Sequence, residues 1–367
     1  DGVTATASTV TSGNTAAQAA VTALASVAGT TGETFTLTTG VDSIVGTAND
    51  DTISAFSAAG ANAATDTLAT ADTIDGGAGT DTLSITNTAN GAATASALIS
   101  NIETINIRQA TAGQTSTLDA STISGVTSVG SNLSLGVVTA TNMAAGSTAN
   151  VIGNGTLVNG ASNFGMVAAA TAQVLGVTSS AAGAIILTGA GVLSTTVNAN
   201  GATNVTGAIT AAATSTTFTL NSALLTAGTV TSAGATAVVL NNAGATTLAD
   251  IATSSAAASL TITGAGATTI TAGLDTGFTT VVAGTATGNL TLTASSLVTA
   301  VTTLGSGDDA YTSAAILTTG SVAGGDGTDT LTLGNVNQAN TASLAAKYTS
   351  FETLGLAGTY NMDLMTS

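Results

Sequence analysis

Two nine-residue segments combine glycine and aspartate in the same order. GGAGTDTLS occupies residues 76–84, and GGDGTDTLT occupies residues 324–332. Both fit the repeat G-G-x-G-x-D-x-U-x, in which U is an aliphatic residue, at every specified position. Glycine allows the tight left-handed turn that aims carbonyl oxygens at a common point, and the aspartate adds an anionic oxygen. Because oxygen ligands suit calcium, the two segments predict calcium-binding turns of a β-roll.

Calcium in such repeats lies between successive turns, so each segment needs an acidic partner. GTANDDTI (46–53) forms a partial turn upstream of the first segment, and DTI (72–74) stands nine residues before DTL (81–83). GSGDDAY (305–311) ends its acidic pair twenty residues before Asp329, which is close to one coil of the chain. The predicted metal ligands, through side chain or backbone, are Asp50, Asp51, Asp72, Asp75, Gly76, Ala78, Asp81, Asp308, Asp309, Gly325, Asp326, Gly327 and Asp329.

The acidic residues are concentrated and almost uncompensated. Of 367 residues, 2 are Lys or Arg and 19 are Asp or Glu, which gives a net charge of -17. Seven of the acids lie from Asp42 to Asp81, and four lie from Asp308 to Asp329. Such clusters repel each other unless a cation neutralises them, and we expect Ca²⁺ in that role. The lack of any basic patch excludes nucleic acid as a partner, and it also excludes polybasic binding to an anionic membrane.

The residue types that are missing restrict the chemistry further. The chain has no His and no Cys, which excludes serine triads, cysteine nucleophiles, the HExxH zinc site, thiolate metal sites and disulfides. Aromatic residues make up 2% of the chain, whereas catalytic clefts are usually rich in them. A carbohydrate-processing β-helix enzyme would need clustered acids in the middle region, where Asp250 and Asp275 are solitary. We therefore expect that the protein is not an enzyme.

Each acidic segment begins a longer duplicated module. GTDTLSIT (79–86) is followed by IETINI (102–107), and GTDTLTLG (327–334) is followed by FETLGL (351–356). The residues between the two parts of each copy carry apolar side chains near helical spacing, which predicts a short covering helix in each. The glutamates of the two E-T triplets, Glu103 and Glu352, are candidate ligands. An acid at a turn before a strand is more often structural, and we favour that interpretation.

The neutral middle of the chain has a glycine period. G-A-T recurs at residues 201, 234, 244 and 266, and glycines follow at 277 and 288, so most intervals are close to multiples of 11. Short β-branched runs follow most of these glycines. This pattern is typical of a β-solenoid with two strands in each coil of about 22 residues. A β-sandwich of similar short strands is the alternative, and we favour the solenoid.

The sequence therefore predicts an all-β, elongated β-solenoid or β-roll-like architecture with Gly-Asp calcium turns and an N-terminal helix. We expect a helical cap over 1–31, with its helix at 14–28. A first calcium module (32–114), a neutral body (115–304) and a second calcium module (305–367) follow. We expect the second module to continue beyond the given chain, or its last strand to pair with a neighbour. No apolar run reaches 18 residues, so no transmembrane segment is expected.

Three segments resemble RTX-type bacterial surface-layer proteins: GETFTLTTGVDSIVGTANDDTISA (32–55), DTIDGGAGTDTLSIT (72–86) and NIETINI (101–107). Similar segments occur in large RTX adhesins. The resemblance implies export in unfolded form by a type I system, calcium-triggered folding outside the cell, and assembly into a lattice or filament. It places the ligand aspartates on Asp81 and Asp329 and the turn glycines on Gly76, Gly77, Gly79, Gly324, Gly325 and Gly327. With only two complete repeats, it implies individual calcium sites rather than a long β-roll.

These observations together predict a secreted structural protein of the cell surface that assembles with copies of itself and depends on calcium for folding and assembly. A cell-surface polysaccharide is a further expected partner, through an anchor outside this segment. The alternative is a segment of an extracellular adhesin or an ice-binding solenoid. That alternative predicts Thr-x-Thr pairs stacked at one fixed position of successive coils, whereas such pairs occur irregularly in the sequence.

Overall fold

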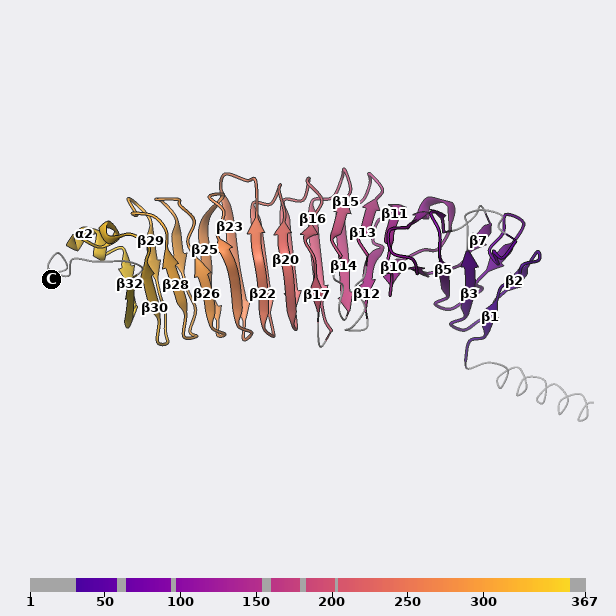
Figure 1. The fold of residues 1–367 in the computed structure, drawn as a ribbon, viewed down its shortest axis with the longest axis horizontal. Coiled ribbons are helices and arrows are strands. Elements are labelled where there is room, and N and C mark those ends of the chain that lie inside the picture. The colour runs from indigo at the N-terminus through magenta and orange to yellow at the C-terminus, as the bar shows by residue number, and fades with distance from the viewer. Residues whose placement is uncertain are drawn as a thin grey trace, which may run out of the picture.

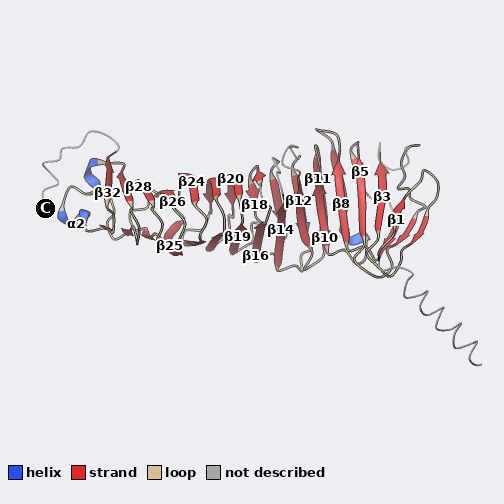
Figure 2. Ribbon diagram, turned by 90° about the horizontal axis from the view of Figure 1, so that it is seen from below, coloured by secondary structure: helices blue, strands red, loops and turns tan. Residues whose placement is uncertain are grey.

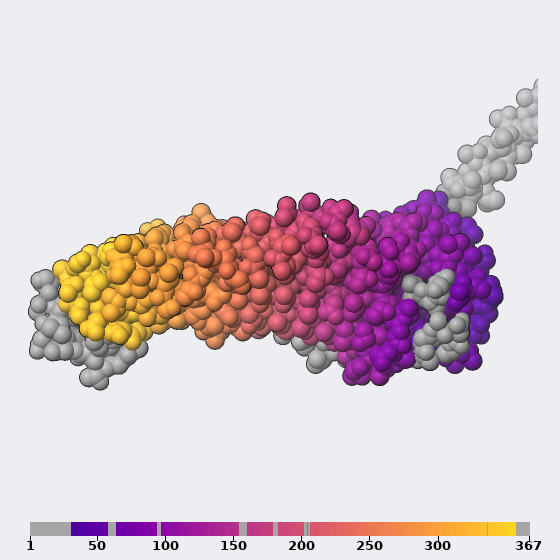
Figure 3. All heavy atoms as spheres, turned by 90° about the horizontal axis from the view of Figure 1, so that it is seen from above, coloured from indigo at the N-terminus to yellow at the C-terminus, as the bar shows by residue number. Residues whose placement is uncertain are grey.

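The chain is wound into an elongated β-solenoid, as predicted. The structure is a computed structural model, and it describes residues 31–57, 64–93, 97–153, 160–178, 183–201 and 204–356. The strands cross the long axis of a rod (Figures 1 and 2), and the chain progresses along that rod from one end to the other (Figure 3). Every strand pair within the described residues is parallel, which excludes the antiparallel β-sandwich. The predicted helix at 14–28 falls outside the described residues.

Two long sheets run the length of the rod, and each coil of the solenoid contributes one strand to each of them over most of that length. Sheet A has 15 strands within the described residues. In order they are β1 (Thr34–Thr36), β3 (Thr52–Ser57), β5 (Thr82–Asn87), β8 (Thr104–Gln109), β10 (Ser128–Asn132), β12 (Thr148–Ile152), β14 (Ala172–Thr178), β16 (Ser194–Ala199), β19 (Thr217–Ser222), β21 (Ala237–Asn242), β23 (Ala258–Gly264), β25 (Phe278–Ala286), β27 (Val301–Thr303), β29 (Ser321–Ala323) and β31 (Tyr348–Thr349).

Sheet C forms the second long side and has 14 strands within the same residues. They are β6 (Gly91–Ala92), β9 (Thr115–Asp119), β11 (Val137–Met143), β13 (Ser162–Met166), β15 (Ile185–Thr188), β17 (Val205–Thr206), β18 (Ile209–Thr210), β20 (Leu225–Thr231), β22 (Thr246–Ala252), β24 (Thr268–Gly273), β26 (Leu290–Thr293), β28 (Ala310–Ser313), β30 (Thr330–Leu333) and β32 (Thr353–Leu356). A short third sheet, sheet B, comprises β2 (Ser43–Val45), β4 (Thr73–Asp75) and β7 (Leu98–Ser100) at the N-terminal end.

Helical structure is scarce in the described part of the chain. It consists of the 3₁₀ turns η1 (Ala120–Thr122) and η2 (Val336–Gln338) and the four-residue helix α2 (Ala342–Ala345). The covering helix predicted in the second module corresponds to α2, whereas the prediction for the first module is wrong because β7 occupies that place. There Ile99 is buried beside Ile74 of β4, so the apolar spacing serves a strand.

Alternation of inward and outward residues builds the core. In β5 the inward residues Leu83 and Ile85 are at most 1% exposed, and they stack on Ile105 and Ile107 of β8. Parallel strands in register place side chains of one type above each other, so apolar columns run along the rod. Phe164, Phe218 and Phe278 are the largest fully buried side chains, and they fill the core of the neutral body.

The outer face of sheet A carries rows of polar residues. One row aligns hydroxyl side chains from the first six coils: Thr34, Thr52, Thr82, Thr104, Ser128 and Thr148. A parallel row in the body contains an asparagine ladder. Asn221 Nδ2 donates to Asn198 Oδ1, and Asn241 Nδ2 donates to Asn221 Oδ1, each at 2.8 Å. The surface of the body is almost uncharged, and it also exposes apolar side chains such as Leu193, Val282 and Val301.

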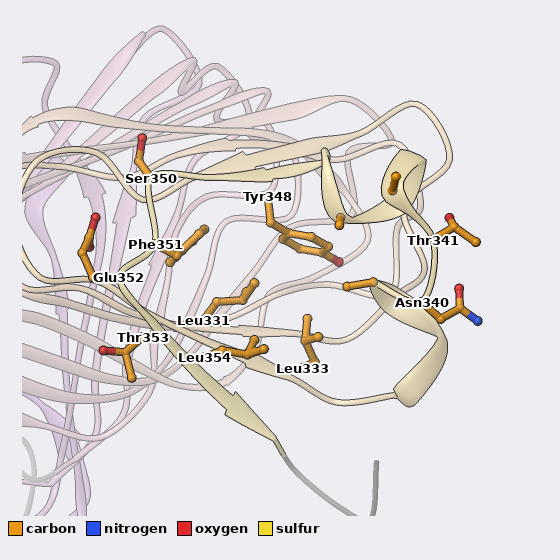
Figure 4. Close-up of a pocket in the computed structure, with 13 residues that line it drawn as sticks. Leu331, Leu333, Asn340, Thr341, Tyr348, Ser350, Phe351, Glu352, Thr353 and Leu354 are labelled. Atoms are coloured by element: carbon orange, nitrogen blue, oxygen red, sulfur yellow. The ribbon is translucent and has the colours of Figure 1, made fainter. Parts of the chain in front are cut away.

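The predicted boundaries between modules and body do not interrupt the sheets. Strand β8 pairs with β10 across the boundary at 114/115, and β27 pairs with β29 across the boundary at 304/305. At the C-terminal end, a cavity of about 440 Å³ opens between α2 and β32 (Figure 4). Leu354 stacks inward on Leu331 there and is 45% exposed. In the described residues, no helix has the length and apolar character needed to span a membrane.

Candidate metal centres

The acidic turns of the first module form a ladder along the rod. Glu33, Asp51, Asp81 and Glu103 each immediately precede a strand of sheet A, and the register aligns them in adjacent coils. We call these four residues the N-terminal ladder. The Asp51 amide donates to Asp81 Oδ1 at 2.7 Å, and the Asp81 amide donates to Glu103 Oε2 at 2.8 Å. The Glu33 amide donates to Asp51 Oδ1 in the same way. Each carboxylate therefore reaches back to the preceding coil.

The second module repeats this arrangement on the opposite long sheet. Asp309, Asp329 and Glu352 precede β28, β30 and β32 of sheet C, and we call them the C-terminal ladder. The Asp309 amide donates to Asp329 Oδ1, and the Asp329 amide donates to Glu352 Oε2, both at 2.8 Å. Figure 4 shows Glu352 between Phe351 and Thr353 at the end of the rod. The duplication seen in the sequence is therefore a duplication of an Asp–Asp–Glu hydrogen-bond chain.

The first aspartate of each chain has both carboxylate oxygens satisfied. Asp51 Oδ2 accepts from the Thr47 amide at 2.5 Å, and the Thr47 hydroxyl donates to Asp51 Oδ1 at 3.0 Å. Asp309 Oδ2 accepts from the Gly305 amide at 3.1 Å. In both turns the donor stands four residues before the aspartate, so the turn itself closes onto its own carboxylate.

The second aspartate of each chain, which is the aspartate of the complete nonapeptide, is left with an unpaired oxygen. Asp81 and Asp329 are both 0% exposed, and their Oδ2 atoms are buried without a hydrogen-bond partner. The residues four positions earlier are Gly77 and Gly325, which have φ angles of 94° and 110°. The left-handed backbone reorients this amide, and the Gly77 amide donates to Asp75 Oδ1 at 3.1 Å instead. The motif glycine thus leaves one carboxylate oxygen unsatisfied.

Glycine is required beside each unpaired oxygen. A Cβ added to Gly76 would lie 2.6 Å from Asp81 Oδ2, and one added to Gly324 would lie 2.6 Å from Asp329 Oδ2. Real Cβ atoms do not approach other atoms so closely. The first glycine of each motif therefore keeps open the space beside the carboxylate oxygen.

The electrostatics separate the two aspartates of the N-terminal ladder. Burial raises the pKa of Asp81, and the nearby charges of Asp51, Glu103 and Asp50 raise it further, against one hydrogen bond from the Asp51 amide. For Asp51, burial also acts to raise the pKa, but hydrogen bonds from Glu33 and Thr47 outweigh it and hold the pKa below its usual range. Desolvation and repulsion thus disfavour a bare negative charge at Asp81, whereas donors stabilise the charge of Asp51.

In the C-terminal ladder the pKa values of both aspartates are raised. Burial raises the pKa of Asp329, and the charges of Glu352, Asp308 and Asp326 add to the effect. The pKa of Asp309 is also raised, first by burial and then by the charges of Asp329 and Asp308. Both complete motifs therefore place an ionisable oxygen where a positive charge would stabilise it.

Other predicted ligands lie around the two ladders. Asp50 and Asp308 are exposed, and their Oδ1 atoms accept from the Thr80 and Thr328 amides of the next coil at 2.7 and 2.8 Å. The remaining turn positions Ala78, Asp326 and Gly327 are exposed, whereas Asp75 and Gly325 are half-buried and Gly76 is buried. The predicted set thus divides into buried ladder aspartates and an exposed acidic rim.

Asp72 belongs to a different arrangement from the one that its spacing suggested. It is nine residues before Asp81 in the sequence, but it precedes β4 of sheet B, half a coil away. Asp72 Oδ1 accepts from the Asp42 amide at 2.9 Å, and its Oδ2 accepts from the Ala69 amide at 2.6 Å. Both oxygens of this buried carboxylate are therefore satisfied within the protein.

No group of three acidic side chains that could hold a metal ion is found among the described residues. The reason is geometric, because each ladder carboxylate turns along the rod toward an amide of the preceding coil instead of toward its neighbours. The other oxygen atoms near each motif are backbone carbonyls and the carboxylates of the acidic rim, such as Asp50 and Asp308.

Sequence reasoning named Glu103 and Glu352 and favoured a structural role for them, but it did not recognise Glu33 or the alignment of the three glutamates with the ladder aspartates. Glu33, Glu103 and Glu352 occupy ladder positions equivalent to the aspartates, and the two last ones accept the amides of the motif aspartates. The signal was present as an acid–Thr–apolar triplet: ETF (33–35), ETI (103–105) and ETL (352–354) repeat the DTL of the motifs. The coils differ in length, with steps of 18, 30 and 22 residues between ladder residues, so the sequence spacing does not reveal that these triplets stack.

The fold and its two ladders define a parallel β-solenoid with an acidic turn module at each end. Neither a scan of protein-family models nor a search of curated proteins gives a match to this chain.

Proposed function

We propose that the protein is a secreted, self-assembling structural β-solenoid of the cell surface, and that Ca²⁺ bound at its two acidic modules drives folding and assembly. The observation that carries this proposal is the unpaired Oδ2 of Asp81 and of Asp329, the same atom in both complete motifs. A buried carboxylate oxygen without a donor is costly, and a bound cation would remove that cost. Binding free energy would then contribute to folding free energy.

The donor set fits calcium better than other metals. The turns offer carboxylate and carbonyl oxygens, and the chain has no His or Cys to attract softer metals. Extracellular calcium modules typically bind with dissociation constants of about 10⁻⁴ to 10⁻³ M. Sites of that affinity would be empty inside a cell and filled outside it, which couples folding to export.

The resemblance to RTX surface-layer proteins and the neutral body support the structural role. Within 120–307 the only ionisable acids are Asp250 and Asp275, so the coils of the body carry hydroxyl and amide groups almost without charge. Rods with such surfaces can approach each other over a wide area without repulsion. Self-association, with a surface polysaccharide as a further partner through an anchor outside this segment, follows as part of the proposal.

The test compares the full chain with and without calcium. Circular dichroism and electron microscopy are recorded in 5 mM CaCl₂ and in excess chelator, and the double variant Asp81→Asn/Asp329→Asn is studied beside Asp250→Asn/Asp275→Asn as a charge-matched control. We expect calcium to induce structure and sheets or filaments in the native protein and in the control, but not in the first variant. Identical secondary structure and assemblies in calcium and in chelator would reject the proposal.

The threonine row on sheet A favours a second candidate, an ice-binding solenoid or an adhesin segment. Thr34, Thr52, Thr82 and Thr104 align at one fixed position, although the neighbouring row contains one threonine, Thr36, followed by Ser54, Ser84 and Asn106. An ice-binding face would enrich the protein in slowly grown ice, and Thr82→Lys would abolish that enrichment. Exclusion of the native protein from the ice rejects this function, and isolated rods in electron micrographs favour the adhesin segment over the lattice.

A further inference from the structure

Two residues with a left-handed backbone occupy equivalent places in the two modules. Among the described residues, four non-glycine residues have positive φ: Asn101 (51°), Leu133 (52°), Asn142 (53°) and Ser350 (55°). Asn101 and Ser350 each stand two residues before the ladder glutamate, in NIE and SFE. Because side chains other than glycine seldom adopt this conformation, its occurrence at the same place in both modules requires a local cause.

The carbonyl oxygens of these two residues and the unpaired carboxylate oxygens lie close to the same point beside a motif glycine. A Cβ built on Gly76 would lie 1.9 Å from the Asn101 carbonyl oxygen and 2.6 Å from Asp81 Oδ2. A Cβ built on Gly324 would lie 1.8 Å from the Ser350 carbonyl oxygen and 2.6 Å from Asp329 Oδ2. In each module, a carbonyl from the third coil and a carboxylate from the second coil therefore lie on the same side of one glycine.

The same geometry is found around Gly46, but there the carboxylate oxygen accepts a hydrogen bond. A Cβ on Gly46 would meet the Gly76 carbonyl oxygen at 1.9 Å and Asp51 Oδ2 at 2.6 Å. There, however, the Thr47 amide satisfies Asp51 Oδ2. The pairing of a carbonyl with a carboxylate thus recurs between coils, and only at the complete motifs is the carboxylate oxygen left without a donor.

We propose that the Asn101 and Ser350 carbonyl oxygens are ligands of the divalent cation held by Asp81 and Asp329, so that the third coil completes each site. This inference rests on the proposed calcium function and adds residues that the glycine–aspartate motif does not contain. A neutral carbonyl and a carboxylate are both ligands that calcium prefers, and each bridges one coil to the next. Asn101 and Ser350 supply this carbonyl two residues before the ladder glutamate, whereas Gly76 supplies it five residues before Asp81. In the shorter turns the carbonyl position goes together with a left-handed backbone.

The test separates backbone preference from side-chain chemistry, because the Asn101 side chain also donates from Nδ2 to Asp75 Oδ1 at 2.7 Å and both variants of Asn101 remove that bond. Asn101→Val and Ser350→Val disfavour positive φ, whereas Asn101→Gly and Ser350→Gly permit it. Asn142→Val is the matched control, because Asn142 has the same backbone conformation outside both modules. Terbium luminescence with calcium competition measures occupancy, and the melting temperature is recorded in calcium and in chelator.

We expect each valine variant to weaken one site by at least tenfold and to reduce the calcium-induced rise in melting temperature. The glycine variants should bind as the native protein does. Asn142→Val should lower the melting temperature equally in calcium and in chelator and leave the titration unchanged. If a valine variant does not fold, Asn101→Ala and Ser350→Ala give a smaller weakening in the same direction.

Three results separate the inference from the function on which it rests. Native protein that binds neither terbium nor calcium overturns the proposed function. Native binding with unchanged titration of the valine variants overturns only the role of the third coil. Equal losses of melting temperature in calcium and in chelator, with unchanged affinity, would also overturn that role, because they would show that the left-handed residues act on the fold alone.

Discussion

The ends of the rod and its body place different types of side chain at equivalent positions of their coils. One register position near the start of each sheet A strand holds carboxylates in the first four coils, hydroxyl or amide side chains in the next four, and apolar residues further along the body. In coil order the column contains Glu33, Asp51, Asp81, Glu103, Thr127, Ser147, Gln173, Thr195, Phe218, Val238 and Leu260. Because every coil offers the same backbone position, a solenoid can change the chemistry of a column without changing the fold.

The corresponding column of sheet C runs in the opposite sense. It contains Leu225, Thr246, Thr268, Leu290, Asp309, Asp329 and Glu352. Apolar and hydroxyl side chains therefore fill the column in the body, and acids fill it at the C-terminal end. The comparison indicates that the body is stabilised by apolar burial at any ion concentration, whereas each end depends on what neutralises its carboxylates.

Removal of calcium should have the largest effect, and it should separate the two kinds of region. In excess chelator we expect amide hydrogen exchange to become fast over 42–107 and 305–356 while 194–264 stays protected. The reason is that the modules lose the charges that neutralise Asp81 and Asp329, but the body loses nothing. Mass-spectrometric exchange of peptides measures each region separately.

Magnesium at the same concentration is the control for ionic strength, since its stricter geometry suits these turns less well. Equal loss of protection in body and modules would contradict the division, and it would mean that the rod unfolds as one cooperative unit.

A change in the body should have an effect that does not depend on calcium. Phe218 is fully buried and stands in the column where the acids stand at the ends. Phe218→Ala should lower the free energy of unfolding of the body by about 3–5 kcal/mol, because it leaves a cavity in the core. Denaturant-dependent hydrogen exchange of 194–264 measures the loss, which should be equal in calcium and in chelator.

Val239→Ala is the control, because Val239 lies on the outer face of the neighbouring strand. If the loss of stability caused by Phe218→Ala disappears in calcium, the ends stabilise the body, and the body is not independent of ions.

The course of the chain through the body was predictable, but the register at the N-terminal end was not. A glycine period near 11 indicated coils of about 22 residues, and the steps from Phe218 to Val238 and from Val238 to Leu260 are 20 and 22 residues. The first two steps are 18 and 30 residues, from Glu33 to Asp51 and from Asp51 to Asp81. Loops on the surface of a solenoid can lengthen without disturbing the stacked strands, so sequence spacing there does not fix which residues align.

The candidate site was predictable in its aspartates and not in its carbonyls. The nonapeptide identified Asp81 and Asp329, and its second glycine predicted the left-handed backbone found at Gly77 and Gly325. No residue type signals that a backbone carbonyl of Asn101 turns toward Gly76, because the carbonyl is common to all residues. Asp72 was misplaced for a related reason, since a step of nine residues leads to another sheet.

Two substitutions within the N-terminal ladder should distinguish the aspartate with satisfied oxygens from the aspartate with an unpaired oxygen. Asp51→Asn removes a carboxylate whose oxygens accept three hydrogen bonds, from the amides of Glu33 and Thr47 and from the Thr47 hydroxyl. Asp51→Asn should lower the free energy of unfolding by about 1.5–3 kcal/mol for each of these hydrogen bonds that is not replaced, in calcium and in chelator alike. Asp81→Asn removes a buried charge with an unpaired oxygen and should stabilise the metal-free module.

Thermal unfolding in chelator and in calcium checks both variants. Asp81→Asn should melt higher than the native protein in chelator and gain little on addition of calcium. A lower melting temperature of Asp81→Asn in chelator would show that its charge stabilises the fold without a cation.

The smallest effect expected is a dependence of the metal-free protein on pH. The raised pKa values of Asp81 and Asp329 mean that their contribution to stability is complete below the unfolded pKa of about 3.9 and is lost as pH rises through the folded values. The lowered pKa of Asp51 has the opposite sign, since its contribution is present above about 3.9 and is lost as pH falls through the folded value. In chelator, the melting temperature of the modules should therefore rise as pH falls from about 7 toward 4 and should decline below that.

Acidification also reduces the magnitude of the net charge of -17, and the weaker self-repulsion stabilises any compact state. The native protein alone therefore cannot separate the two causes. Asp81→Asn/Asp329→Asn retains most of that charge but lacks the two buried carboxyls, and its rise between pH 7 and 4 should be smaller than that of the native protein. With saturating calcium the sign should reverse for the native protein, because protons compete with the cation for the same oxygens. Parallel curves for the native protein and the double variant in chelator would mean that general charge repulsion, and not the ladder, sets the acid response.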